Sequence, residues 1–536
     1  MKLHRLARLS MLGASGALLC ATAACFAPRR APGVVVFASG TDLESGNPLV
    51  TTHPLSRQVQ RFALFVTLAQ YDTGLAPIPY FARRWEWLPD RRTLVMHLVP
   101  DLRWHDGVPT TAGDVVFTLD AARDPATGYW RAGDLGGIDR VDATNDTTVA
   151  VHFRAPQTAF PAIFCELPIA PQHLLGAIAH RELRRAPFDL RPVGNGPFEF
   201  VDRRPGSRWT FRRNPAFPRS LGGPPRLEGL VVTVVDEPTT KFAGLASGDL
   251  DVAGISPAMA SLAGRDPSLR VLSYPILFTT GLVFNVHKAP FDDARVRRAV
   301  SASIDRRRIV DAALAGYGRP AGGAVPPESP LALTLPVERD TALADSLLDA
   351  AGWRRGSDGI RRRAGRRFDI DLLTVGSGDN ALEQLVQADL AARGIRVAIR
   401  QAELGTFLTE ARAAHKRFDL LVAGVPGDVS LSFLSAMFES AQRGGALDYA
   451  DFHGPLLDSL FARARAAPAG RSQAAAWRAV QRLLADSMPV AWIYHSRGVQ
   501  GVTARLANVV MDLRGEMVSL ARWQLEATAP ARVARR

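Results

Sequence analysis

The chain has 536 residues, of which 47% are hydrophobic and 22% are charged. This length exceeds what one hydrophobic core usually supports, so it predicts two or three domains, and the composition excludes a disordered or fibrous chain. The formal net charge of +13 comes almost entirely from arginine. The densest basic run, Gly359–Leu372, is predicted to form two strands joined at a turn, and it lacks the interleaved aromatic residues that stacking on bases requires. Nucleic acid is therefore not an expected partner.

Residues 1–25 are predicted to form an export signal. A basic start is followed by the apolar segment Met11–Cys20 and by the small residues Ala23 and Ala24, the pattern that a signal peptidase recognises. Cys25 stands where a lipobox cysteine would be acylated, but Thr22 occupies the place usually held by Leu, so lipidation of Cys25 is left open. No later apolar stretch is long enough to span a membrane. We expect a protein of the periplasm or cell envelope.

The first half of the chain is predicted to be rich in strands. They are expected at Val34–Phe37, Leu94–Leu98, Thr147–Pro156, a hairpin within Pro192–Pro215, and Leu230–Val235. One helix is expected after the turn at Asp106-Gly107, because Thr111 and Asp114 have the spacing of a capping box. Apolar residues at helical spacing follow this pair.

From Phe368 on, strands and helices alternate. The predicted order is a strand at 368–375, a helix at 380–394, a strand at 395–400, a helix at 404–415 and a strand at 418–424, which is the pattern of a sheet with crossover helices. Ligands bind such sheets beyond the carboxyl ends of the strands. Asp428 lies directly beyond the last strand. Two interpretations remain open, a carboxylate that caps its own loop and a carboxylate that binds a cationic ligand group.

The sequence contains no recognisable reaction centre. It lacks the H-E-x-x-H, G-x-S-x-G and P-loop patterns. His105, Asp106 and Asp114 lie close together in sequence, but turn chemistry and the helix start explain the two acids. We therefore expect no catalytic residue, no metal site and no cofactor, and we favour an exported binding protein with two lobes.

Five segments, in order along the chain, resemble the family 5 extracellular solute-binding proteins, which are the oligopeptide, dipeptide and nickel receptors of ABC importers. The segments are Trp104–Leu119, Pro192–Phe200, Leu245–Ile255, Phe284–Val310 and Leu347–Arg362. The resemblance runs from about Val34 to Trp523. It implies an α/β fold of the periplasmic-binding-protein type, in which two lobes with mixed sheets are joined by a two-strand hinge and the first lobe carries an extra domain.

The resemblance also implies the domain limits. Residues 33–60, 192–278 and 498–525 would form the core of the first lobe, residues 61–191 the added domain, and residues 279–497 the second lobe. Most motif residues are expected to hold the fold and not the ligand. Asp293, Arg295 and Arg297 are predicted to set a helix start and its ion pairs, and Gly194 and Gly196 to fix a hairpin.

In peptide-binding relatives, an acid at the place of Asp428 binds the α-ammonium group of the ligand. The resemblance therefore implies a ligand contact at Asp428, because a desolvated ammonium needs a charged partner. Val425 and Leu404 stand where relatives carry tryptophans in the cleft, so flat aromatic walls would be missing here. Thr52 and His53 align loosely with ligand-contacting positions, with an ordinary surface loop as the alternative, and Tyr494 is a further candidate.

The expected function is capture of a peptide or peptide-like solute by a monomeric receptor, which then delivers it to an ABC permease. A receptor for nickel or a metal chelate is an alternative on the same fold, with His53 or His495 as a ligand, and an oligosaccharide receptor is another. An exported hydrolase or a chaperone-like factor is the alternative from a different class.

Overall fold

The computed structural model describes residues 31–376 and 380–526. Residues from Gly33 on make up one compact unit, and Met1–Pro32 is counted as another. The predicted export signal and Cys25 lie outside the described residues. Of the helices within the described ranges, none combines the length and the apolar character needed to cross a bilayer.

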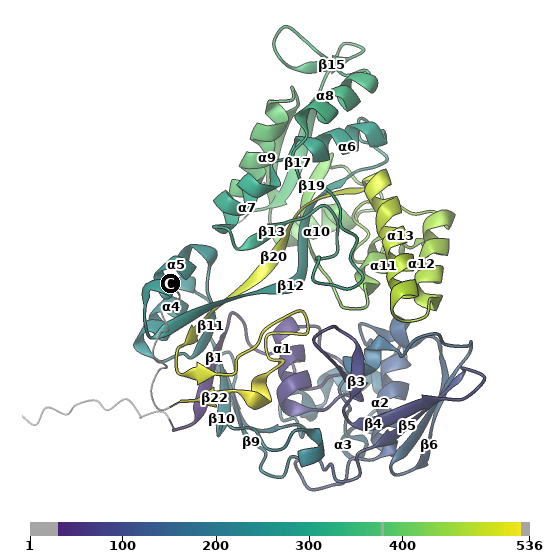
Figure 1. Ribbon diagram of the computed structural model, residues 1–536, viewed down its shortest axis with the longest axis vertical. Coiled ribbons are helices and arrows are strands. Elements are labelled where there is room, and N and C mark those ends of the chain that lie inside the picture. The colour runs from purple at the N-terminus through teal and green to yellow at the C-terminus, as the bar shows by residue number, and fades with distance from the viewer. Residues whose placement is uncertain (1–30, 377–379, 527–536) are drawn as a thin grey trace, which may run out of the picture. The chain divides into compact units, whose positions relative to one another are not determined.

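An eleven-stranded mixed sheet runs through the unit that begins at Gly33 (Figure 1). Its strand order is β18-β17-β19-β12-β20-β11-β1-β10-β9-β8, and β13 pairs with β20 outside this path. The strands are β1 (Val34–Ser39), β8 (Phe198–Arg204), β9 (Arg208–Arg213), β10 (Gly229–Val234), β11 (Val252–Gly254), β12 (Leu269–Phe284), β13 (Gly318–Pro320), β17 (Asp369–Val375), β18 (Arg396–Ala402), β19 (Leu420–Pro426) and β20 (Val490–Thr503). The strands predicted at 34–37 and 230–235 and the hairpin after residue 192 are thereby confirmed as β1, β10 and β8–β9.

Two long antiparallel strands, β12 and β20, connect the two ends of this sheet. β11 pairs with the C-terminal part of β20, at Gln500–Val502. β19 pairs with the C-terminal part of β12, over Phe278–Phe284. The pairing between β12 and β20 shifts register between Pro275 and Thr279. This irregularity lies between the part of the sheet that contains β1 and the part that contains β19.

The predicted β-α-β-α-β order from residue 368 is confirmed by β17, α9 (Ala381–Ala391), β18, α10 (Leu404–Arg412) and β19. In this unit β17 pairs in parallel with both β18 and β19. Successive strand residues point to opposite faces. Leu372 packs with α6 (Ala294–Ser303), α8 (Thr341–Ala350) and α9. Leu373 packs with α10, α11 (Ser432–Phe438), α12 (Pro455–Ala466) and α13 (Arg471–Ser487). Figure 1 shows α9 and α11–α13 on different sides of β17 and β19.

The helices have the following bounds: α1 Pro54–Val59, α2 Ala112–Arg123, α3 Gln172–Leu175, α4 Pro238–Ser247, α5 Pro257–Arg265, α6 Ala294–Ser303, α7 Arg306–Leu314, α8 Thr341–Ala350, α9 Ala381–Ala391, α10 Leu404–Arg412, α11 Ser432–Phe438, α12 Pro455–Ala466 and α13 Arg471–Ser487. The predicted capping box is confirmed at α2. The Thr111 N–H donates to Asp114 Oδ2 over 2.8 Å, and Thr111 Oγ1 accepts the Gly113 N–H over 3.2 Å.

A separate four-stranded antiparallel sheet lies within residues 82–153. Its order is β4 (Ala82–Trp87), β5 (Thr93–Leu98), β7 (Thr148–Phe153) and β6 (Ile138–Asn145). Smaller sheets pair β2 (Ala69–Tyr71) with β3 (Pro77–Pro79), β21 (Leu506–Ala507) with β22 (Gln524–Leu525), and β15 (Arg361–Arg363) with both β14 (Arg354–Arg355) and β16 (Arg366–Arg367).

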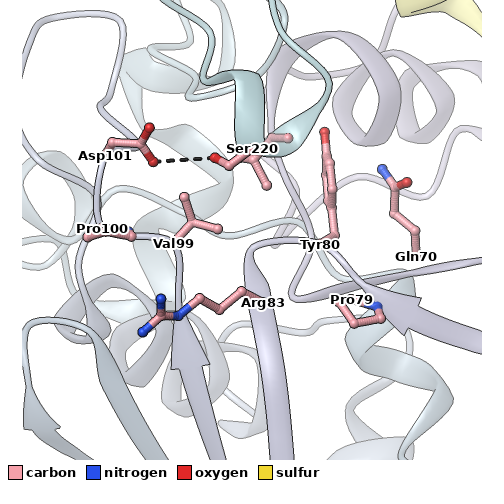
Figure 2. Close-up of a pocket in the computed structure, with 9 residues that line it drawn as sticks. Gln70, Pro79, Tyr80, Arg83, Val99, Pro100, Asp101 and Ser220 are labelled. Carbon is pink, nitrogen blue, oxygen red and sulfur yellow. Dashed lines mark hydrogen bonds between the residues drawn. The ribbon is translucent and has the colours of Figure 1, made fainter.

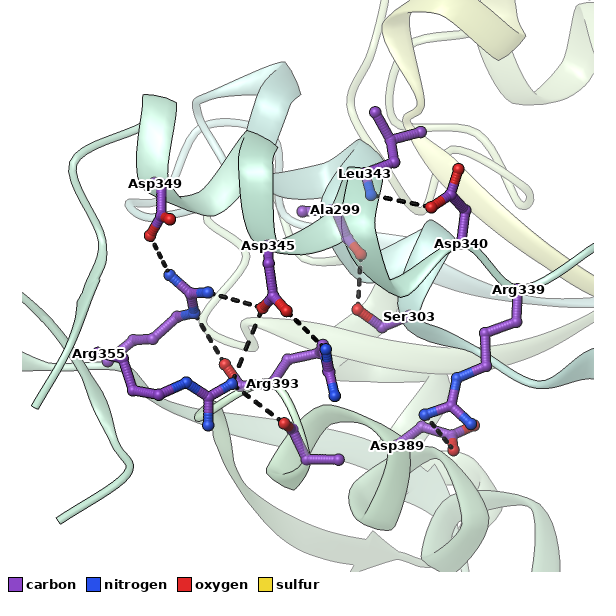
Figure 3. Close-up of polar contacts among 12 residues, drawn as sticks. Ala299, Ser303, Arg339, Asp340, Leu343, Asp345, Asp349, Arg355, Asp389 and Arg393 are labelled. Atoms are coloured by element: carbon purple, nitrogen blue, oxygen red, sulfur yellow. Dashed lines mark hydrogen bonds and ion pairs between the residues drawn. The ribbon is translucent and has the colours of Figure 1, made fainter. Parts of the chain in front are cut away.

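The arginine-rich run is paired with acids of the fold. The Arg361 guanidinium is buried and donates to Asp349 Oδ1 over 2.6 Å and to Asp345 Oδ1 over 2.7 Å. Arg393 donates to the other oxygen of Asp345 over 2.6 Å, and Figure 3 shows Asp345 between Arg355 and Arg393. These contacts attach the small β14–β16 sheet to α8, so the charge of this run serves packing as well as solvation.

Candidate functional site

Asp428 lies two residues beyond β19 and accepts four hydrogen bonds from its own loop. Oδ1 accepts the Ser430 hydroxyl over 2.5 Å and the Ser432 N–H over 3.0 Å. Oδ2 accepts the Ser432 hydroxyl over 2.8 Å and the Phe433 N–H over 3.0 Å. A carboxylate offers about four acceptor positions, so this loop and the start of α11 fill all of them. The capping interpretation of Asp428 therefore has direct geometric support, and its contact with a ligand stays a prediction.

Val425 and Leu404 lie in different surroundings. Val425 is 1% exposed in β19 and packs in the core with α10–α13, whereas Leu404 is the first residue of α10 and is 53% exposed. Tyr494 lies on the crossing strand β20, where it pairs with Thr280 of β12 and with Pro320 of β13. Burial raises the pKa of the Tyr494 hydroxyl.

Thr52 and His53 form the entry to α1. Both backbone N–H groups donate to Glu44 Oε2, over 2.8 and 2.9 Å. The two nitrogens of the His53 ring lie 2.8 Å from Ser56 Oγ and 2.9 Å from Thr41 Oγ1. His53 therefore caps the helix, and burial lowers the pKa of its imidazole. These two residues fix the position of α1, whose next turn carries Arg57.

The side chains of two arginines one helical turn apart, Arg57 and Arg61, have no hydrogen bond or ion pair to any part of the chain that the structure describes. Their Nε atoms are buried and lack an acceptor. The Arg57 guanidinium lies 4.3 Å from the ring centre of Trp130, and that of Arg61 lies 4.8 Å from Phe62 and 5.5 Å from Tyr71. Burial is the main cause that lowers the pKa of Arg57, whereas the charges of Glu166 and Asp428 raise it. Asp428 and α1 are thus electrostatic neighbours.

Arg131 connects the surroundings of Arg57 and Trp130 to the loop that contains Asp428. Its side chain is 3% exposed and donates to Asp134 Oδ2 over 2.6 Å, to Glu166 Oε2, and to Ser430 Oγ over 3.2 Å. Burial lowers the pKa of Arg131, but the charges of Glu166 and Asp134 outweigh it and hold that pKa well above its usual value. The Ser430 hydroxyl in turn donates to Asp428 Oδ1. The structure therefore joins the segment after α2 to the loop after β19.

Sequence reasoning missed Arg57, Arg61, Trp130, Arg131 and Glu166. The one available signal was the pair of arginines at positions i and i+4 in Pro54–Leu64, a segment with no acidic residue to pair with them.

His495, the other nickel-ligand candidate, is buried in β20. Its Nδ1 lies 2.9 Å from Thr279 Oγ1, and the Thr279 hydroxyl donates to the Ala324 carbonyl over 3.0 Å. The hydroxyl proton is thereby used, so Nδ1–H is assigned as the donor to Thr279. Burial lowers the pKa of His495 to about 4. At neutral pH this imidazole is uncharged and holds the two crossing strands together.

This burial predicts an acid-sensitive contribution to stability. Between pH 6.5 and 4 the unfolded chain binds a proton at His495 that the folded chain does not, so the free energy of unfolding falls as the pH falls. We expect the stability advantage of the wild type over His495→Asn to shrink by roughly 2 kcal/mol between pH 7 and pH 4.5. Urea unfolding of both proteins at the two pH values measures this, and parallel pH dependences would contradict it.

A group of potential metal ligands lies outside this region. The ligand atoms of Asp448, Asp451 and His453 lie within 4.8 Å of one another. Both acids have other partners. The Asp448 carboxylate accepts the Gly444 N–H over 2.8 Å and the Asp451 N–H over 3.0 Å. Arg443 Nε lies 3.2 Å from Asp451 Oδ1, and His287 Nε2 lies 3.3 Å from Asp451 Oδ2. His453 Nε2 lies 3.2 Å from Asp448 Oδ1, but both ring nitrogens of His453 are buried without a hydrogen bond to the part of the chain that the structure describes.

Two pockets in the described part of the chain contain none of the predicted ligand residues. One has a volume of about 340 Å³ and is lined by Tyr80, Arg83 and Asp101 among others, with Ser220 donating to Asp101 over 3.4 Å (Figure 2). The other includes Asp124 and His180, which are paired over 2.6 Å.

Comparison with known proteins gives consistent results. Residues 76–444 match the family of bacterial extracellular solute-binding proteins, family 5 (its middle region). A dipeptide-binding protein of Escherichia coli (strain K12) is 25% identical over 520 residues, which cover 90% of this chain and 93% of that protein. NikZ from Campylobacter jejuni, solved with Ni(L-His), has a TM-score of 0.77 at 20% identity and covers 92% of this chain and 99% of its own. AppA from Bacillus subtilis, solved with a nonapeptide, has a TM-score of 0.75 at 22% identity, with 92% and 99% covered.

The crossing strands, the mixed sheet and the likeness to these solved structures define the two-lobed periplasmic-binding-protein fold, as predicted. The chain belongs to family 5 of the bacterial extracellular solute-binding proteins.

Proposed function

We propose that this protein is the receptor of an ABC importer that captures a peptide or peptide-like solute and delivers it to a membrane permease. The observation that carries the proposal is the set of contacts from Arg131 through Ser430 to Asp428, which joins the segment after α2 to the loop after β19. The dipeptide-binding relative and the nonapeptide complex of AppA support a peptide as the ligand.

The mechanism follows from two lobes and a hinge. We assign residues 33–60, 192–278 and 498–525 to the first lobe, 61–191 to its added domain and 279–497 to the second lobe. Closure about the crossing strands buries the solute and excludes water, which strengthens each polar contact inside. The ligand shifts the open–closed equilibrium by its extra contacts in the closed state, and the permease distinguishes the two states. The receptor acts as an exported monomer, and a lipid on Cys25 would hold it at the membrane.

A receptor for a metal chelate is the second candidate, because NikZ has the same fold and was solved with Ni(L-His). The geometry of the two candidate histidines favours the peptide instead. Both ring nitrogens of His53 lie within hydrogen-bond distance of hydroxyl oxygens, and His495 is buried against Thr279.

Native mass spectrometry of the protein purified without denaturation tests the function. We expect co-purifying peptides of mixed sequence and restricted length, because a closed receptor retains its ligand. Titration calorimetry with an equimolar tripeptide mixture and with Ni²⁺ plus free histidine then separates the two candidates. Binding of the nickel mixture alone would replace the peptide proposal, and chemical change of the bound peptide would show an enzyme.

The variant Asp428→Ala distinguishes the capping role of this carboxylate from its predicted contact with the ligand. We expect the free energy of unfolding to fall by about 1–2 kcal/mol, because two backbone N–H groups at the start of α11 lose their acceptor. Urea unfolding measures this loss, and an unchanged midpoint would refute the capping role. If the ligand ammonium also contacts Asp428, binding of a free tripeptide weakens by roughly 2–5 kcal/mol while binding of its N-acetyl form does not change.

A further inference from the structure

The region beside the Asp428 loop contains two buried donors without acceptors. Arg57 Nε and Arg61 Nε are buried, and neither guanidinium has a hydrogen bond or an ion pair within residues 31–376 and 380–526. Buried polar groups are nearly always satisfied. Arg203, Arg208, Arg270 and Arg393 also have a buried Nε without an acceptor, but Arg203, Arg270 and Arg393 donate through another nitrogen. Arg57 and Arg61 differ from these in being two unpaired guanidinium groups one turn apart, on α1 and the turn that follows it, and this pairing points to a shared acceptor.

The neighbouring carboxylates do not supply these acceptors. Glu166 accepts the Tyr71 hydroxyl over 2.9 Å on one oxygen and Arg131 on the other. Asp134 accepts from Arg131, and the four acceptor positions of Asp428 are filled by its own loop. Arg131 is thus the arginine that pairs with the acids near Asp428, and Arg57 and Arg61 have no carboxylate partner among the described residues.

Aromatic rings hold the two free guanidinium groups. Arg57 stacks on Trp130, which is 43% exposed, and Arg61 lies against Phe62 and Tyr71. A guanidinium that stacks on a ring keeps its in-plane N–H groups available, and these fit a carboxylate as a two-pronged fork. Stacking also reduces the entropy lost on binding, because the side chains are already ordered.

We propose that Arg57 and Arg61 form an anion site that binds a carboxylate group of the solute. The group of the ligand that is recognised here is then its carboxylate and not its amine. The inference rests on the proposed function, because it names the ligand group that the receptor recognises. It differs from the expectation for Asp428, whose oxygens are occupied by its own loop. An acidic solute without a free amine is thereby included among the ligands.

Matched peptide mixtures test this site. The probes are equimolar N-acetyl tripeptides with uncharged side chains, prepared once as C-terminal acids and once as C-terminal amides. We expect the wild type to bind the acids about 30-fold or more tightly than the amides, because a desolvated charge pair is lost in the amide. Arg57→Gln and Arg61→Gln should each reduce this ratio, and the double variant should bring it close to one.

Arg140→Gln is the control, since Arg140 is 58% exposed and pairs with Asp142 on the surface. It should leave the ratio unchanged. Equal binding of acids and amides by the wild type overturns the proposal without any variant having to fold. Binding of free tripeptides but of neither acetylated mixture also overturns it and leaves the proposed function intact. If no peptide mixture binds and the purified protein carries no peptide, the proposed function fails as well.

Discussion

Arg131→Met is expected to lower the free energy of unfolding by roughly 2–4 kcal/mol, because removing one member of a buried ion pair leaves the other charge unpaired. The Arg131 side chain is 3% exposed and is held by both Asp134 and Glu166. The side chains of these two acids are 30% and 16% exposed, so solvent screens them only in part. Methionine fills a similar volume, which separates the loss of charge from the loss of packing.

The same variant should show a characteristic pH dependence. Without Arg131, burial keeps the pKa of Asp134 raised with no cation to oppose it, so the folded variant binds protons that the unfolded chain releases. The destabilisation should therefore be larger at pH 8 than at pH 5. Urea unfolding of the wild type and Arg131→Met at both pH values measures this. Arg140→Met, whose pair with Asp142 is exposed, should cost at most about 1 kcal/mol. A similar loss in the two variants would refute the role of Arg131.

The sequence predicted local structure well where the determining contacts are close in the chain. The capping box at Thr111 and the strand–helix alternation after residue 368 depend on residues a few positions apart, and both are confirmed. Asp293 also caps α6 as expected, since its carboxylate accepts the Arg295 N–H over 2.9 Å. In contrast, the contact between Arg131 and Ser430 joins positions 299 residues apart. Periodicity and spacing carry no information on such a pair.

Three motif residues have roles that differ from their predicted ones. Gly194 and Gly196 were expected to shape a hairpin, but they lie before β8, where a Cβ atom would stand 2.0 Å from the Leu64 carbonyl oxygen and 2.5 Å from that of Ala63. Glycine is needed for the close approach of two backbones. Arg297 was expected in ion pairs, but it donates to the carbonyls of Phe291, Ser487 and Met488. A sequence shows that an arginine is present and does not show whether its acceptors are carboxylates or main-chain carbonyls.

Arg306→Met is expected to give the largest loss of stability, roughly 3–5 kcal/mol, because several buried acceptors lose a charged donor together. Arg306 is 4% exposed at the start of α7. Its Nε donates to the carbonyls of Ala321 and Trp492 over 3.0 and 2.8 Å, and its Nη2 donates to the Ser301 hydroxyl over 2.7 Å. Burial lowers the pKa of Arg306 to about 10, so the side chain remains charged at neutral pH and is held by dipoles alone.

These contacts tie the end of α6 and the segment after β13 to β20, one of the two crossing strands. The variant therefore tests whether this arginine holds these elements together. Arg306→Lys should recover only part of the loss, because an ammonium cannot reproduce the planar fork that reaches three separate acceptors. Arg307→Met on the same helix is the matched control. Its pair with Glu338 is 73% and 67% exposed, and its loss should cost at most about 1 kcal/mol. Urea unfolding of Arg306→Met, Arg306→Lys and Arg307→Met gives the order of their stabilities. Equal stability of Arg306→Met and Arg307→Met would show that the carbonyls around Arg306 find other donors, and that the arginine is not what joins α6 and α7 to β20.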